Sequence, residues 1–284
     1  MAGDELPALR WGGHALEWGV STYVMAILNA TSDSFSGDGL DGDLSRAVDL
    51  AQRVVAEGAG IIDVGGESTR PGYSPVDAAD EIARVVSVIR AIAPHVRVPI
   101  SVDTSKAAVA EAAIVAGASM INDVRGFTGD PELKFVVARH GLPAVIVHDR
   151  ALDGPGDLMT QVLRELSRRL DSALAAGIAW EKLIIDPGFG FGKQWPQNLE
   201  LLRRMGELKV LGRPVLAGLS RKKTIAHVLG AGDRSPLEGT LATTALAISQ
   251  GADIVRVHDV EPNVRVARMT DAVVRGNLES PERR

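Results

Sequence analysis

The 284-residue sequence contains no cysteine, and this absence removes several classes of site at once. Disulfide frameworks, zinc sites built on thiolates and thiol nucleophiles all require cysteine, so none of them is available to this chain. Aromatic residues are also scarce, at 4% of the chain, whereas 45% of it is hydrophobic and 24% is charged. This composition is typical of a soluble globular protein with one large domain or two ordinary ones, and it excludes disorder, collagen and coiled coil.

The sequence also lacks a long apolar run and a basic block. No stretch approaches the roughly 18 consecutive apolar residues of a membrane span, so we expect no membrane partner. The first residues, MAGDELPALRWGG, carry acids where a secretory signal needs cations, which predicts a cytoplasmic location. The formal net charge of −5 is spread along the chain, so we expect no nucleic-acid partner, and any anionic ligand needs a local cluster of cations.

Short apolar runs alternate with stretches of helical spacing along the whole chain. The runs are 23–28, 60–64, 98–102, 119–121, 144–147, 183–185, 215–217 and 254–257. The stretches of helical spacing include 43–57, 76–93, 105–116, 158–176, 197–211 and 237–250, with Asp77, Ser105 and Ser220 as expected helix caps. Apolar strands that alternate with helices are typical of a parallel sheet, and eight such units in about 250 residues predict an α/β fold, a (β/α)₈ TIM barrel. The alternative is a doubly wound open sheet, but no G-x-G-x-x-G follows the first strand.

No break in composition marks a second domain, so we predict a single barrel domain over residues 23–276. Residues 1–22 contain LRWGGHALEWG, which predicts a short N-terminal hairpin that closes the bottom of the barrel. Residues 277–284 are predicted to form a disordered tail.

Polar and ionisable residues follow every predicted strand, at the end of the barrel where functional side chains gather. They include Asn29, Asp63, Asp103, Asn122, Asp123, His148, Asp149, Asp186, Ser220, Arg221, Lys222, Arg256, His258 and Asp259. Carboxylates and an amide suit a flat heterocycle with several N–H donors, because an ionised carboxylate accepts two parallel hydrogen bonds. The cations suit a phosphate. The implied ligand is therefore a polar nitrogenous ring that bears a phosphate.

Some of these residues have a simpler interpretation. We expect Asp63 and Asp123 to bond backbone amides of their loops, Glu67 to pair with a neighbouring cation, and Phe189 to pack in the core. The sequence has no G-x-S-x-G, H-E-x-x-H or Walker motif, so hydrolysis through a covalent serine or a zinc-bound water is disfavoured.

Six segments carry a more specific pattern. They are ILNATSDSFSGDG from Ile27, GIIDVGGESTRPGYSPVDAADEIARV from Gly60, ISVDTSKAAVAEAAIVAGASMINDVRG from Ile100, LIIDPGFGFGK from Leu183, LAGLSRKKTI from Leu216 and RVHDV from Arg256. Together, and in this order, they resemble the dihydropteroate synthases over most of the chain, from Tyr23 to about Arg275. The resemblance implies a transferase of folate biosynthesis that condenses 6-hydroxymethyl-7,8-dihydropterin diphosphate with para-aminobenzoate and releases diphosphate. It also implies Mg²⁺ as cofactor and a homodimer.

The resemblance further implies a role for each matching residue. The pterin ring is expected at Asp103, Asn122, Asp186, Phe191, Lys222 and Arg256. The diphosphate is expected at Asn29, Thr69, Arg70, Arg256 and His258, with Asn29 also the magnesium ligand. The para-aminobenzoate is expected at Phe35, Ser220 and Lys223. The catalytic residues implied in this way are Asp103, Lys222, Arg70 and Asp33, the last two on loops that close over the second substrate.

Three positions depart from the family pattern. Asp149 stands where the family has a methionine of the pterin pocket, Lys223 replaces a hydroxyl residue, and Ser32 stands where proline is common. These departures leave open a paralogue that binds pterin without catalysing the reaction, and an inward-pointing Arg150 would plug the pocket. A pterin-dependent methyltransferase of the same barrel family is a second alternative, although it would not need ESTRPG and SRK for a diphosphate. A Schiff-base aldolase is disfavoured because Lys222 follows an arginine at a predicted helix start.

Overall fold

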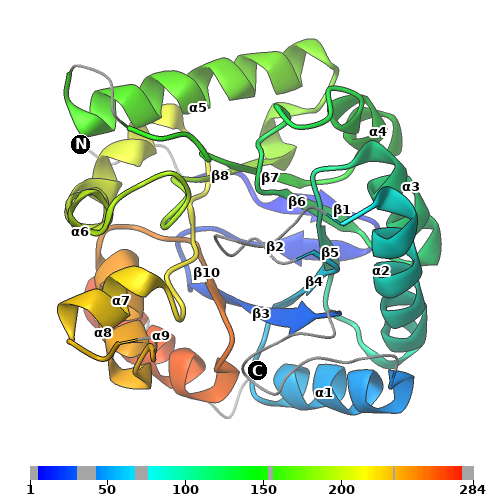
Figure 1. Ribbon diagram of the computed structural model, residues 1–284, viewed down its shortest axis with the longest axis horizontal. Helices are drawn as coiled ribbons and strands as arrows, with labels where there is room; N and C mark the ends of the chain where they lie inside the picture. Colours follow the sequence, from blue (N-terminus) through cyan, green and yellow to red (C-terminus); the bar gives the residue numbers. More distant parts are fainter. Residues whose placement is uncertain (1–5, 31–42, 68–75, 153–155, 233, 277–284) are drawn as a thin grey trace.

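The computed structural model describes residues 6–30, 43–67, 76–152, 156–232 and 234–276. Its central feature is a nearly closed ring of eight parallel strands in the order β8-β7-β6-β5-β4-β3-β10-β9 (Figure 1). The strands are β3 (Tyr23–Asn29), β4 (Ile61–Gly65), β5 (Ile100–Asp103), β6 (Met120–Asp123), β7 (Ala144–Val147), β8 (Leu183–Asp186), β9 (Leu216–Ala217) and β10 (Ile254–Val257). A parallel bridge between Ile185 and Val215 joins β8 to the approach of β9. The predicted TIM barrel is confirmed.

Helices surround this ring (Figure 1). They are α1 (Leu44–Ala56), α2 (Ala78–Ile92), α3 (Ala107–Ala116), α4 (Leu133–His140), α5 (Leu158–Ala175), α6 (Trp195–Arg204), α7 (Lys223–Val228), α8 (Leu237–Ser249) and α9 (Val260–Val274), with 3₁₀ turns at Ala93–His95, Trp180–Lys182 and Met205–Leu211. The predicted helix 197–211 therefore changes to 3₁₀ geometry at Met205, where Gly206 weakens the helix. Within the described residues, none of the helices combines the length and the apolar character needed to cross a membrane.

One predicted helix cap is confirmed and two are wrong. Asp77 caps α2 by accepting a hydrogen bond from the Ala79 amide. Helix α3 is preceded by Lys106 instead of Ser105, because Asp130 from another loop accepts the first amide, that of Ala107, at 2.8 Å. Ser220 does not cap α7, since its hydroxyl contacts His258.

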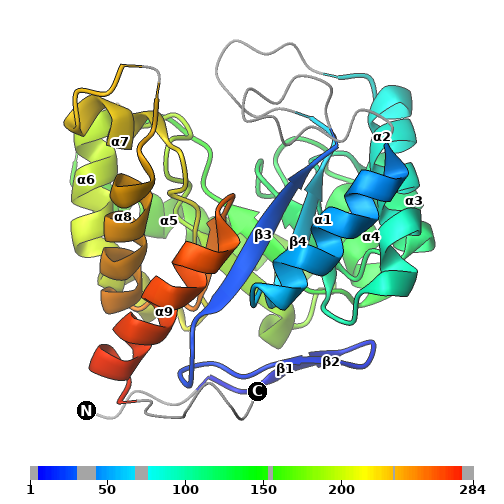
Figure 2. The ribbon, with the colours of Figure 1, turned by 90° about the horizontal axis from the view of Figure 1, so that it is seen from below.

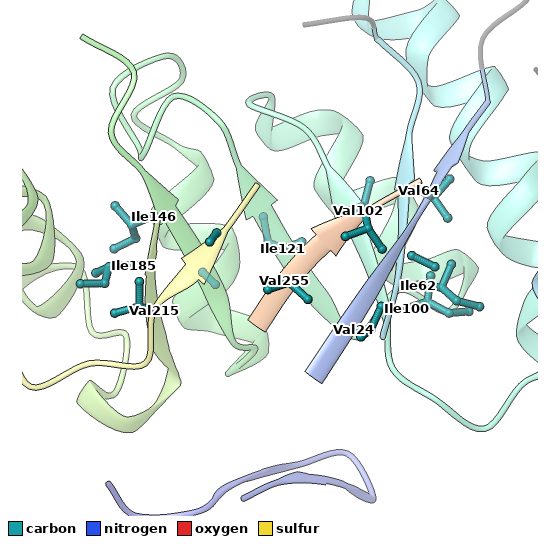
Figure 3. Packing of buried hydrophobic residues seen from close by; sticks show 14 of the residues in the cluster. Val24, Ile62, Val64, Ile100, Val102, Ile121, Ile146, Ile185, Val215 and Val255 are labelled. Carbon is teal, nitrogen blue, oxygen red and sulfur yellow. The ribbon is translucent and has the colours of Figure 1, made fainter. Parts of the chain in front are cut away.

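Alternate residues of each strand face opposite apolar layers, which follows from the period of two in a strand. Residues such as Ile62, Val102, Ile121, Ile185 and Val255 face the helices (Figure 3). Their strand neighbours face the inside of the barrel, where the buried side chains are Met25, Ile61, Met120, Val145, Val147, Ile184, Leu216 and Ile254. The barrel interior is thus a packed core at this level.

The antiparallel hairpin of β1 (Leu9–Trp11) and β2 (His14–Leu16) lies across one end of the barrel (Figure 2). Its buried side chains, Leu9, Trp11 and Leu16, belong to the apolar cluster inside the barrel. The indole N–H of Trp11 also donates to the carbonyl of Ser119 at 2.7 Å. The predicted hairpin is therefore confirmed, whereas the predicted tail 277–284 lies outside the described residues.

Candidate active site

The polar groups predicted at the strand ends face the inside of the barrel, one step above the apolar layer. Asp63, Asn122, Asp186 and Arg256 each stand two residues after an inward-facing Ile61, Met120, Ile184 or Ile254. Residues two apart in a strand lie on the same face, so these polar side chains also point into the barrel. The inner face is therefore apolar at the bottom and polar at the carboxyl ends of the strands.

A guanidinium joins the acids of β4 and β5 across the barrel mouth. Arg256 Nε donates to Asp63 Oδ2 and Arg256 Nη2 donates to Asp103 Oδ2, each at 2.6 Å. The amide of Asn122 donates to the same Asp63 oxygen at 2.9 Å. The prediction that Asp63 bonds loop amides is wrong, because this fully buried carboxylate faces the barrel interior and binds the side chains of two other strands. Asp63 therefore belongs to the site, a role that its place at a strand end allowed but did not distinguish from a loop contact.

Two oxygens of this network remain available to a ligand. In the described part of the chain, Asp63 Oδ1 and Asn122 Oδ1 are buried and have no hydrogen-bond partner. Buried acceptors without partners cost free energy, and a ligand with N–H donors would recover it. The network therefore suits a ring with several N–H groups.

Burial also disfavours the charged forms of Asp103 and Asp186, two carboxylates of the mouth. Burial raises the pKa of Asp103, and the opposing effect of the Arg256 charge does not cancel this rise. Burial raises the pKa of Asp186 to about 6, against the opposing effect of the Gly188 amide, which donates to Asp186 Oδ1 at 2.7 Å. Both carboxylates would gain stabilisation from a donor ligand.

Phe191 and Lys222 form a second side of the mouth. The ammonium of Lys222 lies 4.3 Å from the centroid of the Phe191 ring, a cation–π contact. Lys222 also lowers the pKa of Asp186 through its positive charge. The structure thus brings Asp186, Phe191 and Lys222 together, from the end of β8, the following loop and the residue before α7.

His258 follows β10 and is held by Ser220, which follows β9. The Ser220 hydroxyl lies 3.0 Å from His258 Nδ1 and accepts the His258 amide at 3.2 Å. These two contacts hold His258 beside Ser220 at the barrel mouth. Lys223, the first residue of α7, is exposed, and Asn29 ends β3 beside Gly65 of β4. Asp33, Phe35, Thr69, Arg70 and Ser32 lie outside the described residues.

Asp149 and Arg150, which follow β7, do not enter the mouth. Asp149 pairs with Arg169 of α5 at 2.6 Å and with Arg125 at 3.0 Å. The expectation that this carboxylate replaces a pocket methionine is therefore wrong, because a buried arginine on α5 draws it outward. Arg150 is exposed, 4.0 Å from Glu165 on the same helix, so it does not plug the barrel.

Three simpler interpretations hold. Asp123 accepts the backbone amides of Arg125 and Phe127, so it serves its own loop. Glu67 pairs with Lys106, and Phe189 is buried in the layer between sheet and helices.

Comparison with known proteins identifies the family of the chain. Residues 25–258 match the family described as pterin binding enzyme. The chain is 45% identical to dihydropteroate synthase of Clostridium beijerinckii over 268 residues, which cover 94% of this chain and 100% of the relative. The crystal structure of dihydropteroate synthase from Clostridium difficile, in the presence of pteroic acid, has a TM-score of 0.87 and 45% identity, covering 92% of this chain and 99% of that one. The Xanthomonas albilineans dihydropteroate synthase in complex with 7,8-dihydropteroate has a TM-score of 0.83 and 36% identity, covering 94% and 98%.

Proposed function

The chain belongs to the dihydropteroate synthases, within the pterin-binding enzymes, and from this premise we propose that its barrel mouth condenses 6-hydroxymethyl-7,8-dihydropterin diphosphate with para-aminobenzoate. The products are 7,8-dihydropteroate and diphosphate, and the enzyme is a transferase of folate biosynthesis. The observation that carries the proposal is the buried network of Asp63, Asp103, Asn122 and Arg256 with its unpartnered acceptor oxygens.

The pterin ring is proposed to lie between the acids and the Phe191 side of the mouth. Asp103, Asn122 and Asp186 accept its N–H groups, because carboxylate and amide oxygens are the acceptors present at this depth. Lys222 and Arg256 flank the ring, and Phe191 offers it an aromatic face. Asp63 orients Arg256 and Asn122 through its Oδ2, and its unpartnered Oδ1 is a further acceptor for an N–H group of the ring.

The diphosphate is proposed to face His258, Arg256 and Asn29, with Thr69 and Arg70 on the family's pattern. Cations there neutralise the leaving diphosphate as the bond between the methylene carbon and the diphosphate oxygen breaks. The methylene pterin becomes positively charged, and the carboxylate of Asp103 stabilises that charge. The amine nitrogen of para-aminobenzoate then forms the new carbon–nitrogen bond and releases a proton. An aryl amine is nucleophilic at neutral pH, so no strong base is needed.

Mg²⁺ is proposed as the cofactor, and the donor set fits it only together with substrate. In the part of the chain that the structure describes, no three His, Asp or Glu side chains gather as a metal cage. Asn29 offers one amide oxygen beside Gly65, and Mg²⁺ commonly binds through few protein ligands plus substrate phosphates. When bound, the ion would supply charge neutralisation at the diphosphate.

The para-aminobenzoate carboxylate is proposed near Ser220 and Lys223, with Phe35 and Asp33 on the loop that follows β3. Lys223 is exposed at the start of α7, where its charge suits a carboxylate.

We also propose a homodimer, supported by the exposed apolar side chains Val228, Leu229, Leu237 and Leu246 on and beside α7 and α8. Sedimentation analysis tests this. A cytoplasmic location is proposed because a charged diphosphate substrate does not cross membranes unaided; cell fractionation tests it.

The decisive experiment measures diphosphate release and dihydropteroate formation from the purified protein. We expect both products only when the pterin diphosphate, para-aminobenzoate and Mg²⁺ are present together. Binding of the pterin without release of diphosphate would instead indicate the non-catalytic paralogue. Methyl transfer from methyltetrahydrofolate to a corrinoid protein would indicate the methyltransferase.

A further inference from the structure

Lys193 is a buried lysine that the reaction described above does not use. Lys193 lies near the end of the loop 187–194 between β8 and α6, and it is 8% exposed. Its ammonium lies 3.0 Å from the carbonyl oxygens of His148, Gly188 and Phe191, and 2.9 Å from His148 Nδ1. An ammonium has three protons, so this one is fully occupied by protein acceptors and has none left for a ligand.

The three carbonyls come from two separate segments, the end of β7 and the loop 187–194, and the Lys193 ammonium donates hydrogen bonds to both. The loop lies so close to the end of β7 that a Cβ on Gly188 would be 1.8 Å from the His148 carbonyl oxygen. A Cβ on Gly192 would be 2.6 Å from the Ala151 nitrogen. Carbonyl oxygens that converge on one point repel one another, and a cation at that point converts the repulsion into attraction.

A neutral hydrogen bond from helix α6 also attaches this loop. Asn198 of α6 accepts the Gly190 amide at 2.9 Å, and its Nδ2 donates to Thr224 of α7 at 3.1 Å. Phe191 lies between these two attachments, with its carbonyl on Lys193 and its ring under Lys222. The position of the ring therefore depends on both.

We infer that Lys193 is a positioning residue for the pterin: its ammonium holds the backbone of Phe191 so that the aromatic ring lines the mouth of the barrel. The inference rests on the proposed function, because it assigns the purpose of the Phe191 ring to pterin binding. It predicts an effect on one substrate only.

The charged groups around Lys193 make this hold sensitive to pH. Burial lowers the pKa of Lys193 to about 7; Asp186 and Asp149 favour its charge, whereas Arg169 and Lys222 oppose it. Burial also lowers the pKa of His148 to about 3, so its ring stays neutral and Nδ1 accepts from the ammonium. As the pH rises through 7, Lys193 loses its proton and the carbonyls lose their cation.

The first test is Lys193→Met, which keeps the length of the side chain and removes the charge. We expect the KM for pterin diphosphate to rise at least tenfold, and the KM for para-aminobenzoate to stay within twofold. The matched control is Lys182→Met, since Lys182 also donates to a backbone carbonyl, that of Gly141, but below β8. The control should leave both constants within twofold. A pterin KM within twofold of wild type in Lys193→Met would overturn the inference.

A double-mutant cycle tests whether Lys193 acts through Phe191. Titration calorimetry with pterin diphosphate would compare Phe191→Ala, Lys193→Met and the double variant. We expect the double variant to bind within twofold of Phe191→Ala. Multiplied losses would contradict an action through Phe191.

If Lys193→Met does not fold, the wild-type enzyme still allows the test. The affinity ratio of wild type to Phe191→Ala for pterin diphosphate should fall at least threefold between pH 6 and pH 8.5. A constant ratio would refute the inference. A wild-type protein that forms no dihydropteroate refutes the proposed function instead, so the two failures are distinguishable.

Discussion

The bottom and the mouth of the barrel are built on the same strands and the same inner face, two residues apart. At the bottom, Ile61, Met120, Ile184 and Ile254 form a layer of buried hydrocarbon beneath the mouth. At the mouth, Asp63, Asn122 and Asp186 are buried and Arg256 is partly buried. Two acceptor oxygens there, Asp63 Oδ1 and Asn122 Oδ1, have no partner among the described residues. The lower layer stabilises the fold, whereas the upper layer costs stability and gains ligand affinity in return.

The largest expected effect is at the mouth, in Asp103→Asn. We expect dihydropteroate formation to fall by about 1,000-fold or more, because the amide cannot stabilise the positive charge that forms as diphosphate leaves. The free energy of unfolding should change little, because the variant removes the burial cost of the carboxylate charge while the asparagine oxygen can still accept from Arg256. Product formation and urea unfolding measure the two quantities. Activity within tenfold of wild type would remove Asp103 from the site.

Ile184→Ala tests the lower layer on the strand that carries Asp186. Ile184 is fully buried, so we expect the free energy of unfolding to fall by about 3 kcal/mol through lost burial and a cavity. Both KM values should stay within twofold at temperatures where the variant is folded. A selective change in the pterin KM would show that the two layers are not separate.

The stability cost of the upper layer should depend on pH through Asp186. Burial raises its pKa to about 6 from an ordinary 3.8, so the folded state holds this proton more tightly than the unfolded chain. The residue therefore costs no stability below about pH 4, and its cost grows as the pH rises toward 6. We expect Asp186→Asn to gain on the order of 2 kcal/mol relative to wild type between pH 4 and pH 7.5, by denaturant unfolding. A difference that is flat with pH would contradict the raised pKa.

The smallest expected effect is in the hairpin below the barrel. Trp11→Phe removes the indole N–H that bonds the Ser119 carbonyl and keeps an aromatic ring. We expect a loss of about 1 kcal/mol in unfolding free energy and unchanged kinetics. An altered KM would show that the hairpin reaches the mouth.

The strands could be predicted from the sequence because they are buried on both sides and their apolar runs are continuous. The predicted runs 144–147 and 254–257 coincide with β7 and β10. The residues of the mouth were predicted mainly through the resemblance, and the structure brings together Asp103, Asn122, Asp186, Phe191, Lys222 and Arg256.

The missed features depend on contacts that are distant in sequence. An aspartate at a strand end looks the same whether it bonds its own loop, as Asp123 does, or an arginine 193 residues away, as Asp63 does. The turn of Asp149 toward α5 depends on Arg169, and here a signal was present. Arg169 stands three residues after Leu166 on the buried face of its helix, where a charge requires a partner.

Arg256 lies on β10, the last barrel strand along the chain, while its partners Asp63 and Asp103 lie on the early strands β4 and β5. A chain in which β10 has not yet been synthesised lacks the cation that pairs with both acids, so we expect the mouth to form only when the whole ring has closed. Ligand-binding capacity should then emerge at the close of translation, together with the finished ring.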